Sequence, residues 1–283
     1  MNRIVEIDFL KGLSVMFMMI SHMGVFGNIT IKNLKLNRNF NLKLKLEDTK
    51  IFNFIGVVSH IIFIILVGVN MVSSYHRNVE SKEIMSKNKD NAEINSSNDN
   101  DTDKQKNIYQ FRKRNQRRAL IIIAYGGAMT LLARVFFGKW YILFGIFQFI
   151  GVSILIAIYF VENYNIYKII LALLFILIAT TLSSTSIVNP NNTSVLYNFL
   201  IGKVTYKFMD YFPLIPYFAY ILVGIVAGKC MYKKIDLFKD KFKYRSLNTI
   251  AKIGQKALPI YFGHLIIIFV LVRVCVRRPF IRI

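Results

Sequence analysis

The chain has 283 residues, of which 54% are hydrophobic and only 18% are charged. A soluble protein of this length would cover an apolar core with polar residues, and this composition has too few of them, so the sequence indicates an integral membrane protein. The formal net charge of +22 would suit a nucleic-acid partner, but Lys and Arg lie in the connections between apolar runs, as orientation signals and lipid headgroup contacts require. We therefore expect membrane lipids as partners and no nucleic acid.

Apolar runs of membrane-spanning length recur along the chain and predict an all-α bundle of about seven transmembrane helices in a single polytopic domain, 1–283. The predicted spans are 9–27, 51–74, 119–137, 140–161, 166–182, 212–231 and 258–276. With the N-terminus in the cytoplasm, 23 of the 37 Lys and Arg residues lie on the inner side, which favours that orientation. The basic C-terminal residues then lie outside, so an eighth or a missed span stays open.

The connection between the second and third spans is different in kind. It contains SKNKDNAEINSSNDNDTDKQKN, which has almost no apolar residue. Such a composition cannot support a packed core, so 80–107 is predicted to be a disordered cytoplasmic insert. The basic run that follows includes Arg114, Arg117 and Arg118. These arginines could hold the phosphates of a cofactor, although membrane orientation requires the same positive charge.

The first span carries ionisable residues on one face. At about 100° per residue, Asp8, Lys11, Val15, Met18 and His22 fall within roughly an 80° arc of a helix. Ionisable groups at membrane depth are costly and tend to face a bundle interior or a wet cavity, where they mark function. Asp8 and Lys11 stand three residues apart and can pair as ions, which leaves His22 alone along the face. Alternatively, Asp8 and Lys11 sit at the cytoplasmic boundary and His22 is a packed polar residue.

Other spans also carry polar residues. In the second span His60 lies on a polar stripe with Asn53 and Asn70, which is consistent with either packing or function. In the fourth span Gln148 needs a hydrogen-bond partner at membrane depth and could line a cavity. The last span places His264 in an apolar frame.

Asp210 precedes the sixth span. It can cap that helix, and as an acidic residue at an outer helix mouth it could also orient a cationic or amine substrate. The sequence contains no Gly-rich phosphate loop, no metal-ligand cluster and no Ser-His-Asp order, and its two cysteines lack paired spacing. We therefore expect no metal site and no ATP-driven chemistry.

Five blocks, in order along the chain, resemble the prokaryotic branch of the heparan-α-glucosaminide N-acetyltransferase catalytic-domain family: RIVEIDFLKG, ISH, FGIFQFIGVS, DYFPLIPYFAYILVGIVAG and IGQKALPIYFGH. The likeness runs nearly end to end, apart from 75–118. It implies a transmembrane acyltransferase that takes an acetyl group from cytoplasmic acetyl-CoA and places it on an amino sugar or glycan across the bilayer, here a prokaryotic plasma membrane.

The spacing of Lys11 and His22 is similar to that in the related acyltransferase family three, where a basic residue, ten residues and then an essential histidine occur in the first helix. Animal lysosomal members of the N-acetyltransferase family are thought to use a histidine in the loop after the first span, and 28–50 contains none. The resemblance therefore implies His22 as the catalytic histidine, with His60 second.

The chemistry suits these residue types. A CoA thioester is already activated, so acyl transfer needs a base for the proton of the attacking amine or hydroxyl, or a nucleophile that carries the acyl group. Histidine can do either, and desolvation in the bilayer favours its neutral form. The residues expected to bind substrate are Asp8, Lys11, Gln148, Asp210 and His264. The alternative is a non-enzymatic multi-pass protein, a proton-coupled transporter or a lipid-binding protein, whose histidines carry protons or fix helix packing.

Overall fold

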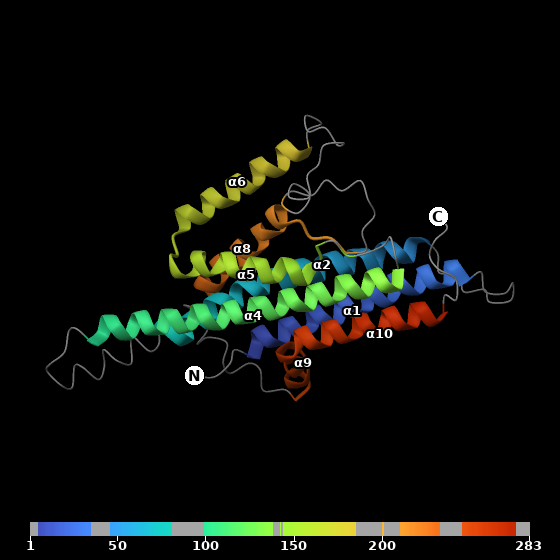
Figure 1. Ribbon diagram of the computed structural model, residues 1–283, viewed down its shortest axis with the longest axis horizontal. Coiled ribbons are helices and arrows are strands. Elements are labelled where there is room, and N and C mark those ends of the chain that lie inside the picture. Colours follow the sequence, from blue (N-terminus) through green and yellow to red (C-terminus); the bar gives the residue numbers. More distant parts are fainter. Residues whose placement is uncertain are drawn as a thin grey trace. The chain divides into compact units, whose positions relative to one another are not determined.

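The computed structural model describes residues 5–34, 46–80, 99–137, 142, 144–184, 200, 210–232 and 245–275. The described residues are mostly helical, with one parallel bridge between Phe144 and Tyr211. The elements are α1 Val5–Leu34, α2 Leu46–Tyr75, the π-helix η1 His76–Glu80, α4 Asp99–Phe137, α5 Ile146–Glu162, α6 Ile166–Ser184, α8 Leu214–Tyr232, α9 Arg245–Gln255 and α10 Ala257–Cys275 (Figure 1). The predicted fold class, an all-α integral membrane protein, is confirmed.

Each predicted span coincides with a helix, but the helices differ in length. Among the described residues, 50–80, 102–136 and 214–231 are long and apolar enough to cross a membrane, and α9 with α10 adds a fourth crossing if the bent pair counts as one span. The apolar helices α5 and α6 are shorter. The count of seven spans and the cytoplasmic N-terminus stay predictions.

Helix α4 begins at Asp99, inside the stretch 80–107 that was predicted to be disordered. Its first turns include Asp103, and an acidic side chain near a helix N-terminus is stabilised by the helix dipole. A polar helix of this kind needs no apolar core when it continues an apolar one, which composition alone does not reveal. Residues 81–98 of the predicted insert lie outside the described part of the chain.

The chain divides into two compact units. The first unit comprises 67–128 and 142–236, and in it α8 packs against both α5 and α6. Its core includes the fully buried side chains of Phe149 and Leu222. The chain turns from α5 into α6 at Asn165, whose side-chain oxygen accepts a hydrogen bond from the Tyr167 backbone N–H at 2.9 Å and so caps α6.

The second unit comprises 2–66, 129–141 and 237–283, and in it α1 packs against α9 and α10. The axes of α9 and α10 meet at 83°, with Lys256 between them. Pro259 lies in the first turn of α10, where its missing N–H removes no helical hydrogen bond. Helices α1 and α9 approach closely because Gly12 lies against the Ile250 carbonyl and Gly254 against the Asp8 carbonyl.

Candidate active site

Helix α1 presents His22 to the interior of the second unit. The preceding residue, Ser21, donates a hydrogen bond to the Phe52 carbonyl of α2 at 2.7 Å, and the small residue Gly56 of α2 lies directly against Ser21. These contacts bring the two helix backbones together and fix the rotation of α1 about its axis. His22 is therefore held by its neighbours on α1 rather than by a loop.

Three histidines meet in this unit. The Nδ1 atom of His22 lies 3.0 Å from the Nε2 atom of His264, and the two rings stack with centroids 5.3 Å apart at an interplanar angle of 13°. The His60 ring lies 5.9 Å from that of His22 and is tilted by 57°. Residues from the first, second and last predicted spans thus converge, with His22 in the centre.

The hydrogen bonds restrict the tautomers of these rings. Nδ1 of His60 is bonded to the Gly56 carbonyl oxygen, which can only accept, so Nδ1 carries the proton and Nε2 the lone pair. Between His22 and His264, one of the two facing nitrogens must carry a proton when both rings are neutral. Each neutral ring in the group therefore has one unprotonated nitrogen, which is the atom that can take up a proton.

Sequence reasoning did not identify Tyr261 as a site residue. It lies one turn before His264 on α10, its ring meets that of His264 edge-on at 4.8 Å, and it lies 5.7 Å from the His22 ring. Both Tyr261 and His264 are buried. Their spacing of three residues was the available signal, since it places both side chains on one helix face.

The predicted ion pair between Asp8 and Lys11 is confirmed, with 3.4 Å between the Lys11 Nζ and an Asp8 carboxylate oxygen. Both side chains are largely buried. The pair does not join the histidines, because Lys11 and His22 are eleven positions apart, which is about 16 Å along a helix. It lies instead where α9 crosses α1 through Gly12 and Gly254.

Gln148 and Asp210 both bond to the backbone at the start of α5 in the first unit. Asp210 Oδ2 accepts a hydrogen bond from the Ile146 backbone N–H at 3.1 Å, and Gln148 Oε1 accepts one from the Gly145 N–H, also at 3.1 Å. Asp210 therefore caps α5, and the expectation that it caps the sixth predicted span was wrong. The parallel bridge between Phe144 and Tyr211 brings it to this helix end, across a separation that sequence does not reveal.

Burial raises the pKa of Asp210 from its ordinary value of 3.8 to about 6, and the hydrogen bond from Ile146 opposes that rise. The carboxyl group is therefore ionised at neutral pH but held in a place that disfavours its charge. Asp210 belongs to the first unit and the histidines to the second.

The arginines predicted to bind cofactor phosphates lie on the polar half of α4. Arg114, Arg117 and Arg118 are all exposed. The guanidinium of the neighbouring Arg112 is bonded to both carboxylate oxygens of Glu162, with its Nε 2.9 Å and 2.8 Å from them.

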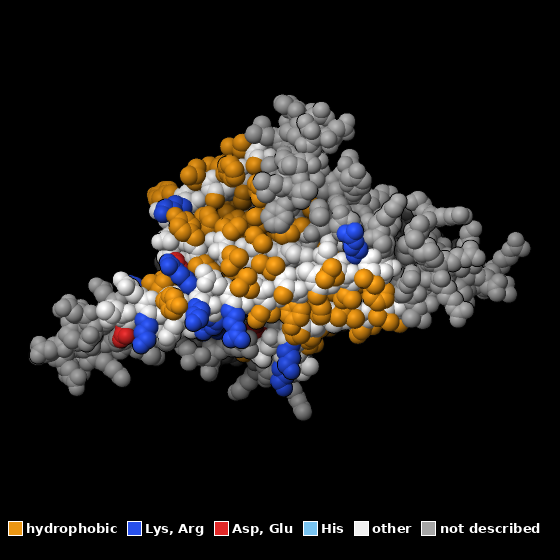
Figure 2. Space-filling model, viewed as in Figure 1, with side chains coloured by type: hydrophobic (Ala, Val, Ile, Leu, Met, Phe, Trp, Pro, Cys, Tyr) orange, Lys and Arg blue, Asp and Glu red, His pale blue; other side chains and the backbone are white. Residues whose placement is uncertain are grey.

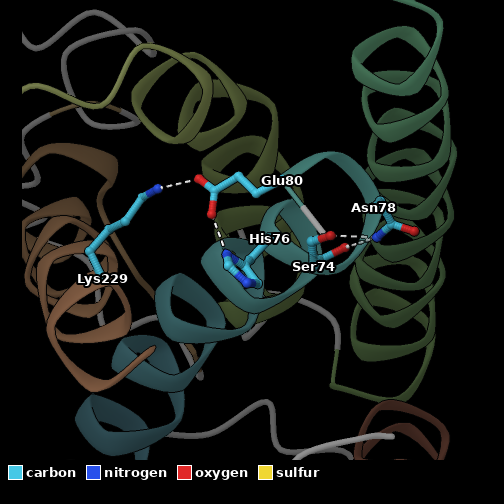
Figure 3. Close-up of polar contacts among 5 residues, drawn as sticks. All are labelled: Ser74, His76, Asn78, Glu80 and Lys229. Atoms are coloured by element: carbon cyan, nitrogen blue, oxygen red, sulfur yellow. Dashed lines mark hydrogen bonds and ion pairs between the residues drawn. The ribbon is translucent and has the colours of Figure 1, made fainter. Parts of the chain in front are cut away.

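A second polar network was not predicted from the sequence (Figure 3). Glu80 of η1 accepts hydrogen bonds from His76, one turn earlier, and from Lys229 of α8 at 2.8 Å. The Lys229 ammonium also lies over the rings of Tyr75 and Tyr164, at 5.7 Å and 5.5 Å from their centroids. This network joins α2, η1, α8 and the connection between α5 and α6 within the first unit, and the spacing of His76 and Glu80 was its signal in the sequence.

Within the described residues, no group of three or more His, Cys, Asp or Glu side chains is arranged to hold a metal ion.

A family model described as "Heparan-alpha-glucosaminide N-acetyltransferase, catalytic" matches residues 3–266. Comparison with curated proteins and with solved structures found no match. Because the family match covers most of the chain and includes both histidine-bearing ends, the chain belongs to this family. It is an integral membrane protein of an acetyltransferase family, which implies an acyl donor and a glycan or amino-sugar acceptor.

Proposed function

We propose that this protein transfers an acetyl group from cytoplasmic acetyl-CoA to an amino sugar or glycan on the other side of a prokaryotic plasma membrane, with His22 as the general base. The observation that carries the proposal is the 3.0 Å contact between His22 Nδ1 and His264 Nε2. A base held in hydrogen-bond contact with an orienting partner is a recurring arrangement in acyl transfer.

The proposed tautomer places the shared proton on His22 Nδ1, which donates to His264 Nε2. His22 Nε2 is then unprotonated. It takes the proton of the attacking amine or hydroxyl as the amine nitrogen or hydroxyl oxygen bonds to the acetyl carbonyl carbon. The thioester C–S bond breaks and CoA leaves as its thiolate, which takes up the proton held by the His22 imidazolium and so regenerates the neutral base. His264 would stabilise the imidazolium that forms on His22. A path in which a histidine first carries the acetyl group uses the same lone pair.

The other predicted site residues keep supporting roles in this proposal. Asp210, ionised at neutral pH, and Gln148 would orient the amine of the acceptor. Lys11, paired with Asp8, would contribute to acyl-CoA binding. Arg114 and Arg118 share one flank of α4, about 40° apart around the helix, and would contact CoA phosphates. Arg117 lies nearer the outward face of the helix.

The test uses the purified full chain in detergent, with acetyl-CoA and glucosamine, and measures both thiol release and acetylated product. We expect His22→Ala to remain folded and to lose about 10²-fold or more of the transfer rate, the scale for a positioned general base. His60→Ala is the control for histidine removal at this site. Loss of transfer in His60→Ala with an active His22→Ala would place the base on α2.

The role of His264 has its own matched pair. His264→Gln keeps an oxygen that can accept the His22 Nδ1 proton, whereas His264→Leu does not, so Gln should retain clearly more activity than Leu at equal thermal stability. Full activity in His22→Ala and His60→Ala together would exclude both as the base. No turnover by the wild-type protein, despite bound acetyl-CoA, would favour the non-enzymatic alternative.

A further inference from the structure

The polar half of α4 presents basic side chains on the face that turns away from the core of the first unit. Phe111, Asn115 and Ala119 are buried, and Phe111 meets Tyr75 edge-on at 5.2 Å, so this side of α4 faces the core. Lys113 and Arg117 lie on the opposite side and are exposed. The ion pair of Arg112 with Glu162 lies on one flank and further fixes the rotation of the helix.

The same outward face continues into the apolar half of α4. At about 100° per residue, Lys113, Arg117, Leu120 and Ala124 fall within roughly a 60° arc. Leu120 is 61% exposed. Figure 2 shows Lys and Arg side chains gathered over the first half of α4 and hydrophobic side chains further along it. The outward-facing stripe of α4 therefore changes from basic to apolar along the helix while it stays on the same helix face.

The apolar part of this stripe belongs to a helix long and apolar enough to cross a membrane, where lipid tails can pack against it. Arg117 is about 3 Å and Lys113 about 9 Å along the axis from Ala119, where the apolar half begins. That is the depth of the headgroup layer, which is about 5–8 Å thick on each side of a bilayer, and long basic side chains reach along the helix to it. Within the described residues, neither side chain forms an ion pair.

We propose that Lys113 and Arg117 together bind the phosphate of one acidic phospholipid, whose tails pack along the exposed apolar stripe that starts at Leu120. Residues four apart on a helix have Cβ atoms about 5–6 Å apart, so both cations can contact one phosphate diester. The basic pair and the apolar stripe lie on one helix face, so together they suit a phospholipid, which has both a phosphate and apolar tails. A soluble anion would contact only the basic pair. This surface is independent of the acyl-transfer chemistry proposed above.

The experiment is native mass spectrometry of the full chain released from detergent micelles, titrated with phosphatidylglycerol or with phosphatidylcholine. The wild-type protein should bind the first phosphatidylglycerol more tightly than phosphatidylcholine. Lys113→Gln/Arg117→Gln should weaken phosphatidylglycerol binding at least fivefold, since each cation near an acidic lipid surface contributes about that factor. Phosphatidylcholine binding should not change.

Two further variants isolate the cause. Lys113→Arg/Arg117→Lys keeps the charges and should retain the preference. Lys106→Gln removes a cation from the same helix face about 20 Å from Ala119, beyond headgroup contact, and should have little effect. Unchanged phosphatidylglycerol binding in the double Gln variant, or an equal loss in Lys106→Gln, would overturn the proposal. Competition by inorganic phosphate, or a loss of desulfo-coenzyme A binding in place of lipid binding, would assign the pair to a soluble phosphate and also overturn it.

Discussion

Replacement of Asp210 by Asn tests how the first unit holds its buried carboxyl group. Asp210 Oδ2 accepts the Ile146 N–H at the start of α5, and burial raises its pKa from 3.8 to about 6. Asn has nearly the same shape and keeps an oxygen for the cap, but it cannot ionise. The substitution therefore removes the charge and leaves the hydrogen bond.

The sign follows from proton linkage. A carboxyl group whose pKa is higher in the folded than in the unfolded protein makes folding less favourable as pH rises between the two values. A rise from 3.8 to about 6 corresponds to about 3 kcal/mol above pH 6 and to almost nothing below pH 4. We expect Asp210→Asn to be more stable than wild type by about 2–3 kcal/mol at pH 7.5, and the difference to vanish near pH 4.

The measurement is unfolding by SDS in mixed micelles, followed by circular dichroism between pH 4 and 7.5. Asp210→Ala is the control, since it also removes the charge but loses the cap and should be about 0.5–2 kcal/mol less stable than Asp210→Asn. If Asp210 orients the acceptor amine, Asp210→Asn should also raise KM for the acceptor while the protein becomes more stable. An Asn variant that is less stable than wild type, with a gap that widens as pH rises, would refute the reasoning because the carboxylate would then be favoured by its surroundings.

Two further predictions concern packing and charge. Gly254→Ala places a methyl group against the backbone carbonyl of Asp8, so we expect thermal unfolding to show a loss of stability of about 1–3 kcal/mol. Gly263 has open space around it, so Gly263→Ala should be neutral or stabilising. Equal stability of the two variants would contradict the close packing of α1 and α9. Lys229→Met should destabilise the first unit because it leaves Glu80 without this partner, and a double-mutant cycle with Glu80→Gln should give a coupling of about 0.5–3 kcal/mol; a coupling near zero would show that the contact does not stabilise the protein.

Helix positions could be predicted from sequence because membrane depth demands long apolar runs, and such runs are visible without tertiary information. The bend between α9 and α10 could not, because α9 is polar enough to read as part of a connection. Its position depends on Gly254, which allows the backbone of α9 to lie against α1. A glycine's neighbours are a tertiary property, so the sequence shows the residue but not the contact.

The candidate site could also be predicted only in part. A stripe repeating at about 100° identified the face of α1 that carries His22, and a similar stripe in the second span included His60. His264 was visible as a polar residue in an apolar frame. Asp210 was misassigned because its partner, the N-terminus of α5, lies 64 residues away, whereas the sixth span is adjacent in sequence. Local capping rules assign a residue to the nearest helix in sequence. Here the parallel bridge between Phe144 and Tyr211 brings Asp210 to a different helix, α5.

The proposed chemistry of His22 depends on which of its ring nitrogens carries the proton, and sequence periodicity does not reveal that. A polar stripe shows that the ring faces the interior, but a neutral imidazole acts as a base only through the nitrogen that lacks a proton. In the proposed tautomer His22 Nδ1 donates to His264, which stands 242 positions away, and this leaves Nε2 as the base. Helix rotation sets where His22 points, whereas in the proposed mechanism the packing of α10 against α1 sets which of its nitrogens acts as the base. Substitutions that rotate α10 should therefore lower the acetyl-transfer rate although His22 itself is unchanged. Substitutions on the α1 face near Asp8 should mainly lower the stability of the protein.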